Sequence, residues 1–78
     1  MIGKILKNLR VNKNFKQSDL SKIVNIPQNT ISQYENGKIQ PTFEIIEKIA
    51  NACDFKIEFK NKKSGEIITT KNIERKEI

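Results

Sequence analysis

The sequence predicts a small, mainly α-helical domain of four helices followed by a C-terminal β-hairpin, and three observations lead to this fold class. Apolar residues recur every three or four positions through residues 1–54, which is typical of helices that share one core. Asparagine, proline and glycine interrupt that repeat at short intervals, where a chain turns. After Asp54 the repeat changes to an alternation of apolar and charged residues, which indicates strands.

The first two helices are predicted from apolar residues that fall on one side. In the first helix these residues are Ile2, Ile5, Leu6 and Leu9. The polar run Asn-Lys-Asn at 12–14 breaks the pattern. The second helix covers residues 17–24, and its apolar residues are Leu20, Ile23 and Val24. Both helices are therefore expected to bury these faces in one small core.

A tight turn separates the second helix from a third helix at residues 28–35. Asn25 can adopt the left-handed backbone conformation that such a turn needs. Pro27 suits the first turn of a helix but not its interior. The pair Asn36-Gly37 then acts as a stop signal for the third helix. Two short helices joined in this way are a helix-turn-helix.

A fourth helix is expected to begin after Thr42. The hydroxyl of Thr42 can accept a hydrogen bond from a backbone N–H of the first turn, which makes it a good N-cap. The predicted buried face of this helix consists of Phe43, Ile46, Ile49, Ala50 and Cys53. Because Cys53 lies at helical spacing on that face, a buried and unreactive thiol is favoured over a nucleophile.

Residues 55–70 are predicted to form a β-hairpin. Phe55, Ile57 and Phe59 alternate with charged residues, the run NKKSG forms a turn, and EIITT is a second strand-forming run. A lone hairpin is marginally stable in water, so its apolar face must pack on its own helices or on a second copy. The chain thus divides into a helical domain at 1–54, a hairpin at 55–70 and a charged tail at 71–78.

The composition argues against several classes of protein. The chain has 78 residues, no histidine and one cysteine, which exclude a disulfide framework and leave almost nothing for a metal site. Its carboxylates are scattered, so no catalytic residue and no cofactor is predicted, and an enzyme is disfavoured. No run approaches the roughly 18 apolar residues of a membrane span, and the start is unlike a signal peptide. A cytoplasmic protein is expected.

The charge is unevenly distributed along the chain. Residues 1–41 hold seven cations and two acids, a net charge of +5, whereas residues 42–78 hold eight cations and seven acids. A basic half joined to a balanced half is typical of proteins that bind polyanions. A lysine-rich surface that only keeps a small protein soluble explains the same charge equally well.

The outer face of the third helix carries uncharged polar side chains, namely Gln28, Asn29, Ser32 and Gln33. The second helix of a helix-turn-helix enters the major groove of DNA. A carboxamide there can donate and accept at once, which matches the N6 donor and N7 acceptor of adenine. Lysines alone would bind phosphate without reading sequence. The position directly after the turn favours base reading over an inert polar surface.

The stretch KQSDLSKIVNIPQNTISQYENGKIQP resembles the helix-turn-helix signature of the phage repressor and Cro family, also called the XRE family. The resemblance covers residues 2–54 and implies a lambda-repressor-like fold. It rests on Gln17 opening the second helix, Leu20 before a small serine, the Thr-Ile-Ser triplet at 30–32, and Glu-Asn-Gly-Lys at 35–38 ahead of a proline. It further implies a transcriptional regulator that binds double-stranded DNA as a homodimer.

The resemblance also assigns roles to single residues. In such repressors, residues matching Gln17, Asn36 and Lys38 hold the DNA backbone. Residues matching Gln28, Asn29 and Gln33 read bases. The resemblance also implies that Arg10 pairs with Glu35, as a scaffold contact rather than a contact with DNA.

The chain departs from the family pattern at three places. Lys16 stands where a capping threonine is common, Pro27 stands where the third helix is usually capped, and the hairpin replaces a fifth helix. We expect Phe55, Ile57 and Phe59 to join two copies, and the competing interpretation is that this face caps its own helices. The alternative function is an antitoxin or adaptor that acts through its hairpin, with a toxin as partner.

Overall fold

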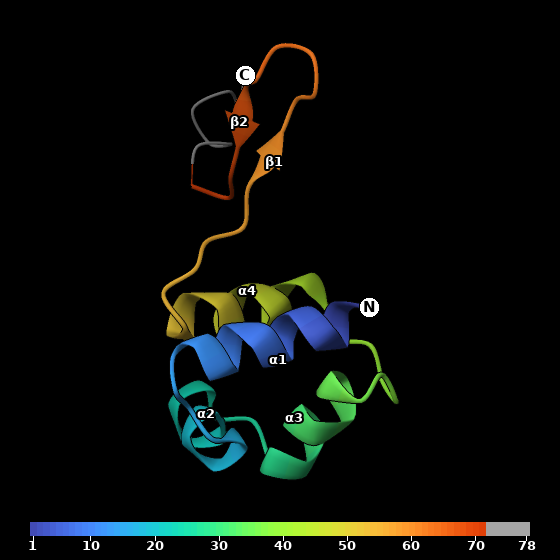
Figure 1. The fold of residues 1–78 in the computed structure, drawn as a ribbon, viewed down its shortest axis with the longest axis vertical. Helices are drawn as coiled ribbons and strands as arrows, with labels where there is room; N and C mark the ends of the chain where they lie inside the picture. The colour runs from blue at the N-terminus through green and yellow to red at the C-terminus, as the bar shows by residue number, and fades with distance from the viewer. Residues whose placement is uncertain (72–78) are drawn as a thin grey trace.

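The computed structural model describes residues 1–71, and it contains four helices and one two-stranded antiparallel sheet. The helices are α1 (Ile2–Asn12), α2 (Gln17–Val24), α3 (Gln28–Glu35) and α4 (Phe43–Ala52), and the strands are β1 (Phe59–Lys60) and β2 (Ile67–Ile68). The helices form a bundle, and the hairpin projects from it beyond α4 (Figure 1). The predicted fold class is confirmed, whereas residues 72–78 of the predicted tail lie outside the described residues.

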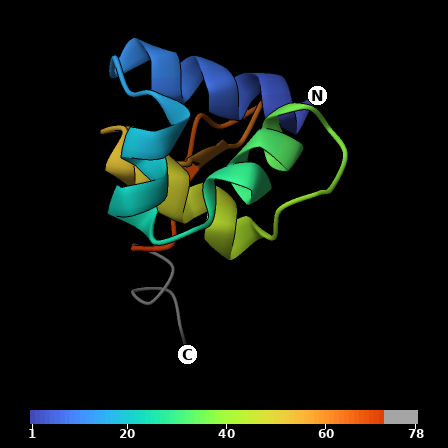
Figure 2. The ribbon, with the colours of Figure 1, turned by 90° about the horizontal axis from the view of Figure 1, so that it is seen from below.

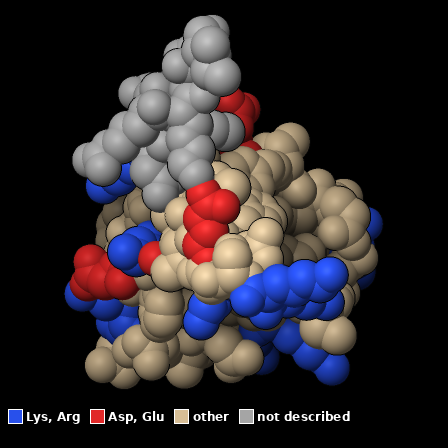
Figure 3. All heavy atoms as spheres, turned by 90° about the horizontal axis from the view of Figure 1, so that it is seen from above, with Lys and Arg blue, Asp and Glu red and all other residues tan. Residues whose placement is uncertain are grey.

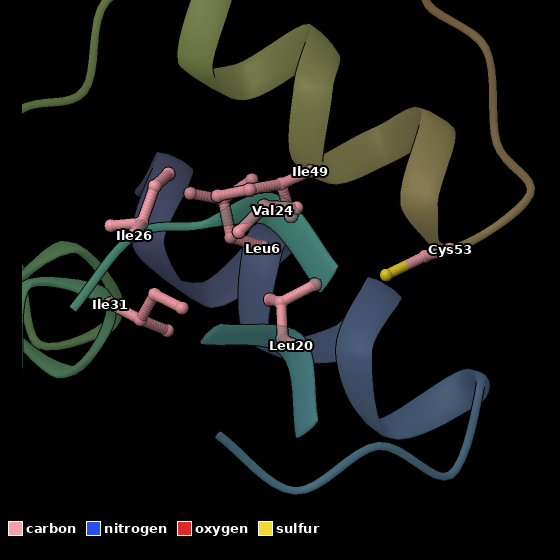
Figure 4. Close-up of a cluster of buried hydrophobic side chains, with 7 residues drawn as sticks. All are labelled: Leu6, Leu20, Val24, Ile26, Ile31, Ile49 and Cys53. Carbon is pink, nitrogen blue, oxygen red and sulfur yellow. The ribbon is translucent and has the colours of Figure 1, made fainter. Parts of the chain in front are cut away.

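The core lies between the four helices, and each of them contributes to it. Its members are Leu6, Leu20, Val24, Ile26, Ile31, Ile49 and Cys53 (Figure 4). Six of these side chains are no more than 1% exposed, and Ile26, in the turn before α3, is 8% exposed. The thiol of Cys53 is buried, as its spacing in the sequence predicts.

The local signals in the sequence set the helix ends. Asn25 has φ +59° and ends α2 in the left-handed conformation, so the turn can lead directly to Pro27 and α3. At the start of α4 the N–H of Ile45 donates to Oγ1 of Thr42 at 3.2 Å, which confirms the predicted N-cap. The side chain of Lys16 offers no acceptor to α2, but the backbone N–H of Lys16 donates to Oδ2 of Asp19 at 2.8 Å. This carboxylate fixes the first turn of α2 from inside the helix.

Three apolar residues that were predicted to be buried are exposed. Ile5 on α1 is 47% exposed, Ile23 on α2 is 54% exposed and Phe43 on α4 is 43% exposed. Each lies at the edge of the apolar stripe of its helix. The buried residues of α1 are Gly3, Leu6 and Arg10, and those of α4 are Ile49 and Ala50, so the side of each helix that faces the core is displaced from the centre of its apolar stripe. The ring of Phe43 instead stacks on Phe59 of β1, with 6.4 Å between the ring centroids.

The hairpin is shorter than the sequence predicts. Only residues 59–60 pair with residues 67–68, and Phe59 lies opposite Ile68. Residues 55–58, which were expected to be part of the first strand, form an extended connection from α4 (Figure 1). Alternating polarity sets where side chains point, but a strand also needs a neighbour to pair with, and these residues have none among residues 1–71.

The expected apolar face of the hairpin is not buried by the chain's own helices. Phe55 is 41% exposed and Phe59 is 62% exposed, while Ile57 is half-buried. Besides the stacked rings of Phe43 and Phe59, a hydrogen bond from Oγ1 of Thr70 to Oε2 of Glu47, at 2.6 Å, links this end of the chain to α4. These two contacts connect the hairpin end of the chain to α4.

Candidate nucleic-acid interface

Helices α2 and α3 lie at the end of the molecule opposite the hairpin (Figures 1 and 2). The turn between them is held from both sides. The N–H of Ile26 donates to the carbonyl of Ser21 at 3.2 Å, and Oγ of Ser21 donates to the carbonyl of Ile26 at 2.5 Å. Because Ile26 is also buried, the angle between α2 and α3 is fixed by the core.

An open hollow of about 560 Å³ lies on the outer side of α2 and α3. Its walls are formed by Gln17, Gln28, Asn29, Ser32 and Gln33. The structure thus gathers the predicted base-reading residues around Gln17, which opens α2. All five side chains are uncharged and can both donate and accept hydrogen bonds. Such a surface can distinguish between hydrogen-bonding patterns, which a purely cationic surface cannot do.

Asn36 and Lys38 lie beside this hollow rather than in it. Both are exposed and follow the last turn of α3. Nδ2 of Asn36 donates to Oγ of Ser32 at 3.3 Å, and the N–H of Lys38 donates to the carbonyl of Gln33 at 2.9 Å. Gly37 between them has φ +77°, which turns the chain away from the helix axis. Lys38 therefore lies just beyond the C-terminal end of α3.

Arg10 and Glu35 form a bidentate ion pair that joins α1 to the end of α3. Nε of Arg10 lies 2.6 Å from Oε2 of Glu35, and Nη2 lies 3.0 Å from Oε1. Nη1 of Arg10 also donates to the carbonyl of Phe15 at 2.8 Å. The Glu35 side chain is only 3% exposed. Two parallel hydrogen bonds of this kind fix geometry as well as charge.

The pKa of Glu35 reflects this environment. Burial raises the pKa of the carboxyl, because it penalises the charged form. The hydrogen bonds from Arg10 and Gln17, and then the positive charge of Arg10, act in the opposite direction and prevail. The net result is a pKa below the ordinary value, so Glu35 is ionised at neutral pH.

The sequence gives no sign that Gln17 and Glu35 meet. Nε2 of Gln17 donates to Oε1 of Glu35 at 3.1 Å, so a residue assigned to DNA contacts a residue assigned to the scaffold. The two residues lie far apart along the chain, in different helices. Periodicity places residues on the faces of one helix, but it does not say which ends of two helices meet. Only the packing of α2 beside α3 brings them together.

The predicted dimerisation residues lie at the far end of the molecule. Phe55 and Ile57 belong to the extended connection and Phe59 belongs to β1. The face of the molecule opposite α3 carries both acidic and basic side chains (Figure 3).

Among residues 1–71, no helix is both long enough and apolar enough to cross a membrane.

Comparisons with known proteins also identify a helix-turn-helix in this chain. The model of a helix-turn-helix family matches residues 6–60, which is more than half of the chain. The antitoxin PezA of Streptococcus pneumoniae serotype 4 is 41% identical over 49 residues. That match covers 63% of this chain but 31% of PezA, so the chain spans about a third of the length of this curated relative.

Proposed function

Because the chain belongs to the helix-turn-helix family of phage repressor and Cro-like (XRE) regulators, we propose that it is a sequence-specific transcriptional regulator that binds double-stranded DNA. The observation that carries this proposal is the hollow on the outer side of α2 and α3. Five uncharged side chains with hydrogen-bonding capacity gather there, directly after the turn. In a protein of this family, that face is the one that enters the major groove.

In this proposal the residues in and beside the hollow divide into two groups. Gln28, Asn29, Ser32 and Gln33 project from α3 and contact base edges, where a carboxamide pairs with adenine. Gln17, Asn36 and Lys38 flank α3 and contact the sugar-phosphate backbone, which sets the register without reading sequence. One short helix reads only a few base pairs. We therefore propose that two copies bind two half-sites about 34 Å apart on one face of the duplex.

Selection of bound sequences from a random DNA pool tests the function directly. We expect a palindromic site and an affinity that falls steeply with salt. A pool that yields no enriched sequence would contradict sequence-specific binding. Recovery of a single, unrepeated half-site would support base reading by α3 and would contradict binding as a dimer.

Four substitutions separate base reading from positioning. Gln28→Ala and Gln33→Ala should each cost about 1–3 kcal/mol on the selected site and little on random DNA. Gln17→Ala and Lys38→Ala should weaken binding to both kinds of DNA by similar factors. The Lys38 change should also flatten the salt dependence by about one unit. Asn8→Ala, an exposed carboxamide on α1, is the matched control. If Gln28→Ala and Gln33→Ala reduce the affinity for selected and random DNA equally, these residues do not read bases.

The similarity to PezA favours one second candidate, an antitoxin whose hairpin end binds a toxin. The exposed apolar residues of that end lie opposite α3, so a partner there leaves the hollow free (Figure 1). The two candidate functions differ in whether the isolated chain binds a specific DNA sequence. An adaptor that works only through protein contacts would select no DNA sequence from the pool, whereas the regulator proposed above would.

A further inference from the structure

The carboxylate of Glu35 is surrounded by donors in a nearly closed environment. Arg10 supplies two hydrogen bonds, one to each oxygen, and Gln17 supplies a third to Oε1. The side chain of Glu35 is 3% exposed, and that of Arg10 is 10% exposed. The two hydrogen bonds from Arg10 already satisfy both oxygens of Glu35, so the ion pair does not need the third hydrogen bond from Gln17.

That third bond fixes which way the Gln17 carboxamide points. The two ends of a carboxamide have nearly the same shape, so the surroundings decide their orientation. An ionised carboxylate accepts hydrogen bonds and never donates them. Gln17 must therefore turn its NH₂ group towards Glu35, and its carbonyl oxygen and second N–H remain for the hollow that it lines.

We propose that Glu35 is a positioning residue for DNA binding, which acts from inside the scaffold by holding the Gln17 carboxamide in one orientation beside α3. This inference rests on the proposed function. It differs from a purely structural role for the ion pair, because it links Glu35 to one side chain of the binding hollow. Arg10 keeps Glu35 charged and in place, and Glu35 in turn presents Gln17.

The variant Glu35→Gln tests the orientation with little change of shape. Its amide has one accepting oxygen and one donating nitrogen, whereas the carboxylate has two acceptors. If the amide oxygen takes the Oε2 position, opposite Nε of Arg10, the amide nitrogen takes the Oε1 position and faces Gln17, so the Gln17 carboxamide must turn around to offer its oxygen. Loss of one oriented hydrogen bond corresponds to about a 2- to 12-fold change in affinity. We expect that loss on selected and random DNA alike.

A double-mutant cycle separates this effect from damage to the fold. Once Gln17→Ala is present, adding Glu35→Gln should weaken DNA binding no further, although it should still lower stability. Ile49→Val provides the matched control, because Ile49 lies in the core on α4 and not in the hollow. It should lower stability and leave DNA affinity unchanged. Losses that multiply in the double variant would show that Glu35 acts through the fold and would overturn the proposal.

A second measurement needs neither DNA nor a substitution. In the free protein, exchange of the Gln17 side-chain amide protons with water should be slower than that of the exposed Gln40, as measured by NMR. Equal exchange rates would overturn the inference even if the chain binds DNA well. A chain that selects no DNA would overturn the proposed function and this inference with it, whereas slow exchange together with the expected cycle supports both.

Discussion

At the scale of single residues, the ionisation of Glu35 contributes to the free energy of unfolding, and this contribution depends on pH. Because hydrogen bonds from Arg10 and Gln17 lower its pKa in the folded state, folding favours the charged carboxyl. The unfolded pKa of a glutamate is about 4.3. The contribution is therefore fully present above that pH and is lost as pH falls through the folded value.

This reasoning predicts how Glu35→Gln changes the acid side of the stability profile. In the parent protein, the free energy of unfolding should fall steadily as pH drops below about 4.3. In the variant, which cannot ionise at this position, that fall should be shallower. Urea unfolding at a series of pH values measures both slopes. Parallel slopes would show that Glu35 gains nothing from its partners in the folded state.

The sequence was informative about some residues of the site and silent about others. Gln28, Asn29, Ser32 and Gln33 could be placed on one face because the bounds of α3 follow from Pro27 and the Asn36-Gly37 stop. The contact between Gln17 and Glu35 could not be predicted, because it depends on how the start of α2 meets the end of α3. The spacing of residues within one helix does not show which ends of two different helices lie in contact.

At the scale of elements, Gly3 decides how closely α1 approaches α3. A Cβ atom built at Gly3 would lie 2.4 Å from the carbonyl oxygen of Tyr34 and 2.7 Å from that of Glu35. Both distances are far below van der Waals contact, and both partners are backbone atoms that cannot turn aside. The N-terminal turn of α1 can therefore pack on the last turn of α3 only with glycine at this position.

We expect Gly3→Ala to destabilise the protein, although alanine is the better helix former by about 1 kcal/mol. Overpacking of this kind costs about 1–3 kcal/mol, and here α1 or α3 must move to relieve it. Denaturant unfolding gives the change, and Lys4→Ala on the same helix is the exposed control. An alanine variant as stable as the parent would show that the two helices can separate freely.

The elements differ in how well local patterns define them. The helix ends were predictable because Asn25, Pro27 and Thr42 act on their own neighbours. The hairpin was predicted as a unit, but its first strand was too long, because pairing depends on a partner strand that alternation does not reveal. For the same reason, Phe43 was assigned to the core although its ring lies at the surface against Phe59.

At the scale of the whole molecule, α3 and the hairpin occupy opposite ends (Figure 1). The described part of the chain measures 40 Å along its longest axis and 23 and 22 Å across. A protein or a second copy that binds the hairpin end therefore leaves α3 free for DNA. The helix-turn-helix and its core followed from the sequence, whereas this separation did not, because it depends on the extended connection after α4.

The proposed dimer needs an exposed apolar surface, and the hairpin has one. Phe55, Phe59, Ile67 and Ile68 are each at least 38% exposed, although the ring of Phe59 stacks on Phe43 of α4. An isolated hairpin is marginal in water, so burying this apolar area against a second copy would stabilise it. The helical core, in contrast, already uses its buried side chains within one chain.

Phe59→Lys in the full-length chain therefore tests whether the hairpin joins two copies. Phe59 is the most exposed of the aromatic residues there, so a charge at this position should leave the helices folded and disfavour an apolar contact. We expect the parent to be a dimer in solution by mass measurement and the variant to be a monomer with a normal helical signal. The variant should also bind a palindromic site more weakly than the parent, while its affinity for a single half-site stays the same. Ile23→Lys, which changes an apolar residue on α2 that is 54% exposed, should remain a dimer without DNA. A monomeric parent at high concentration, or a Phe59→Lys variant that stays dimeric, would assign the hairpin to another role.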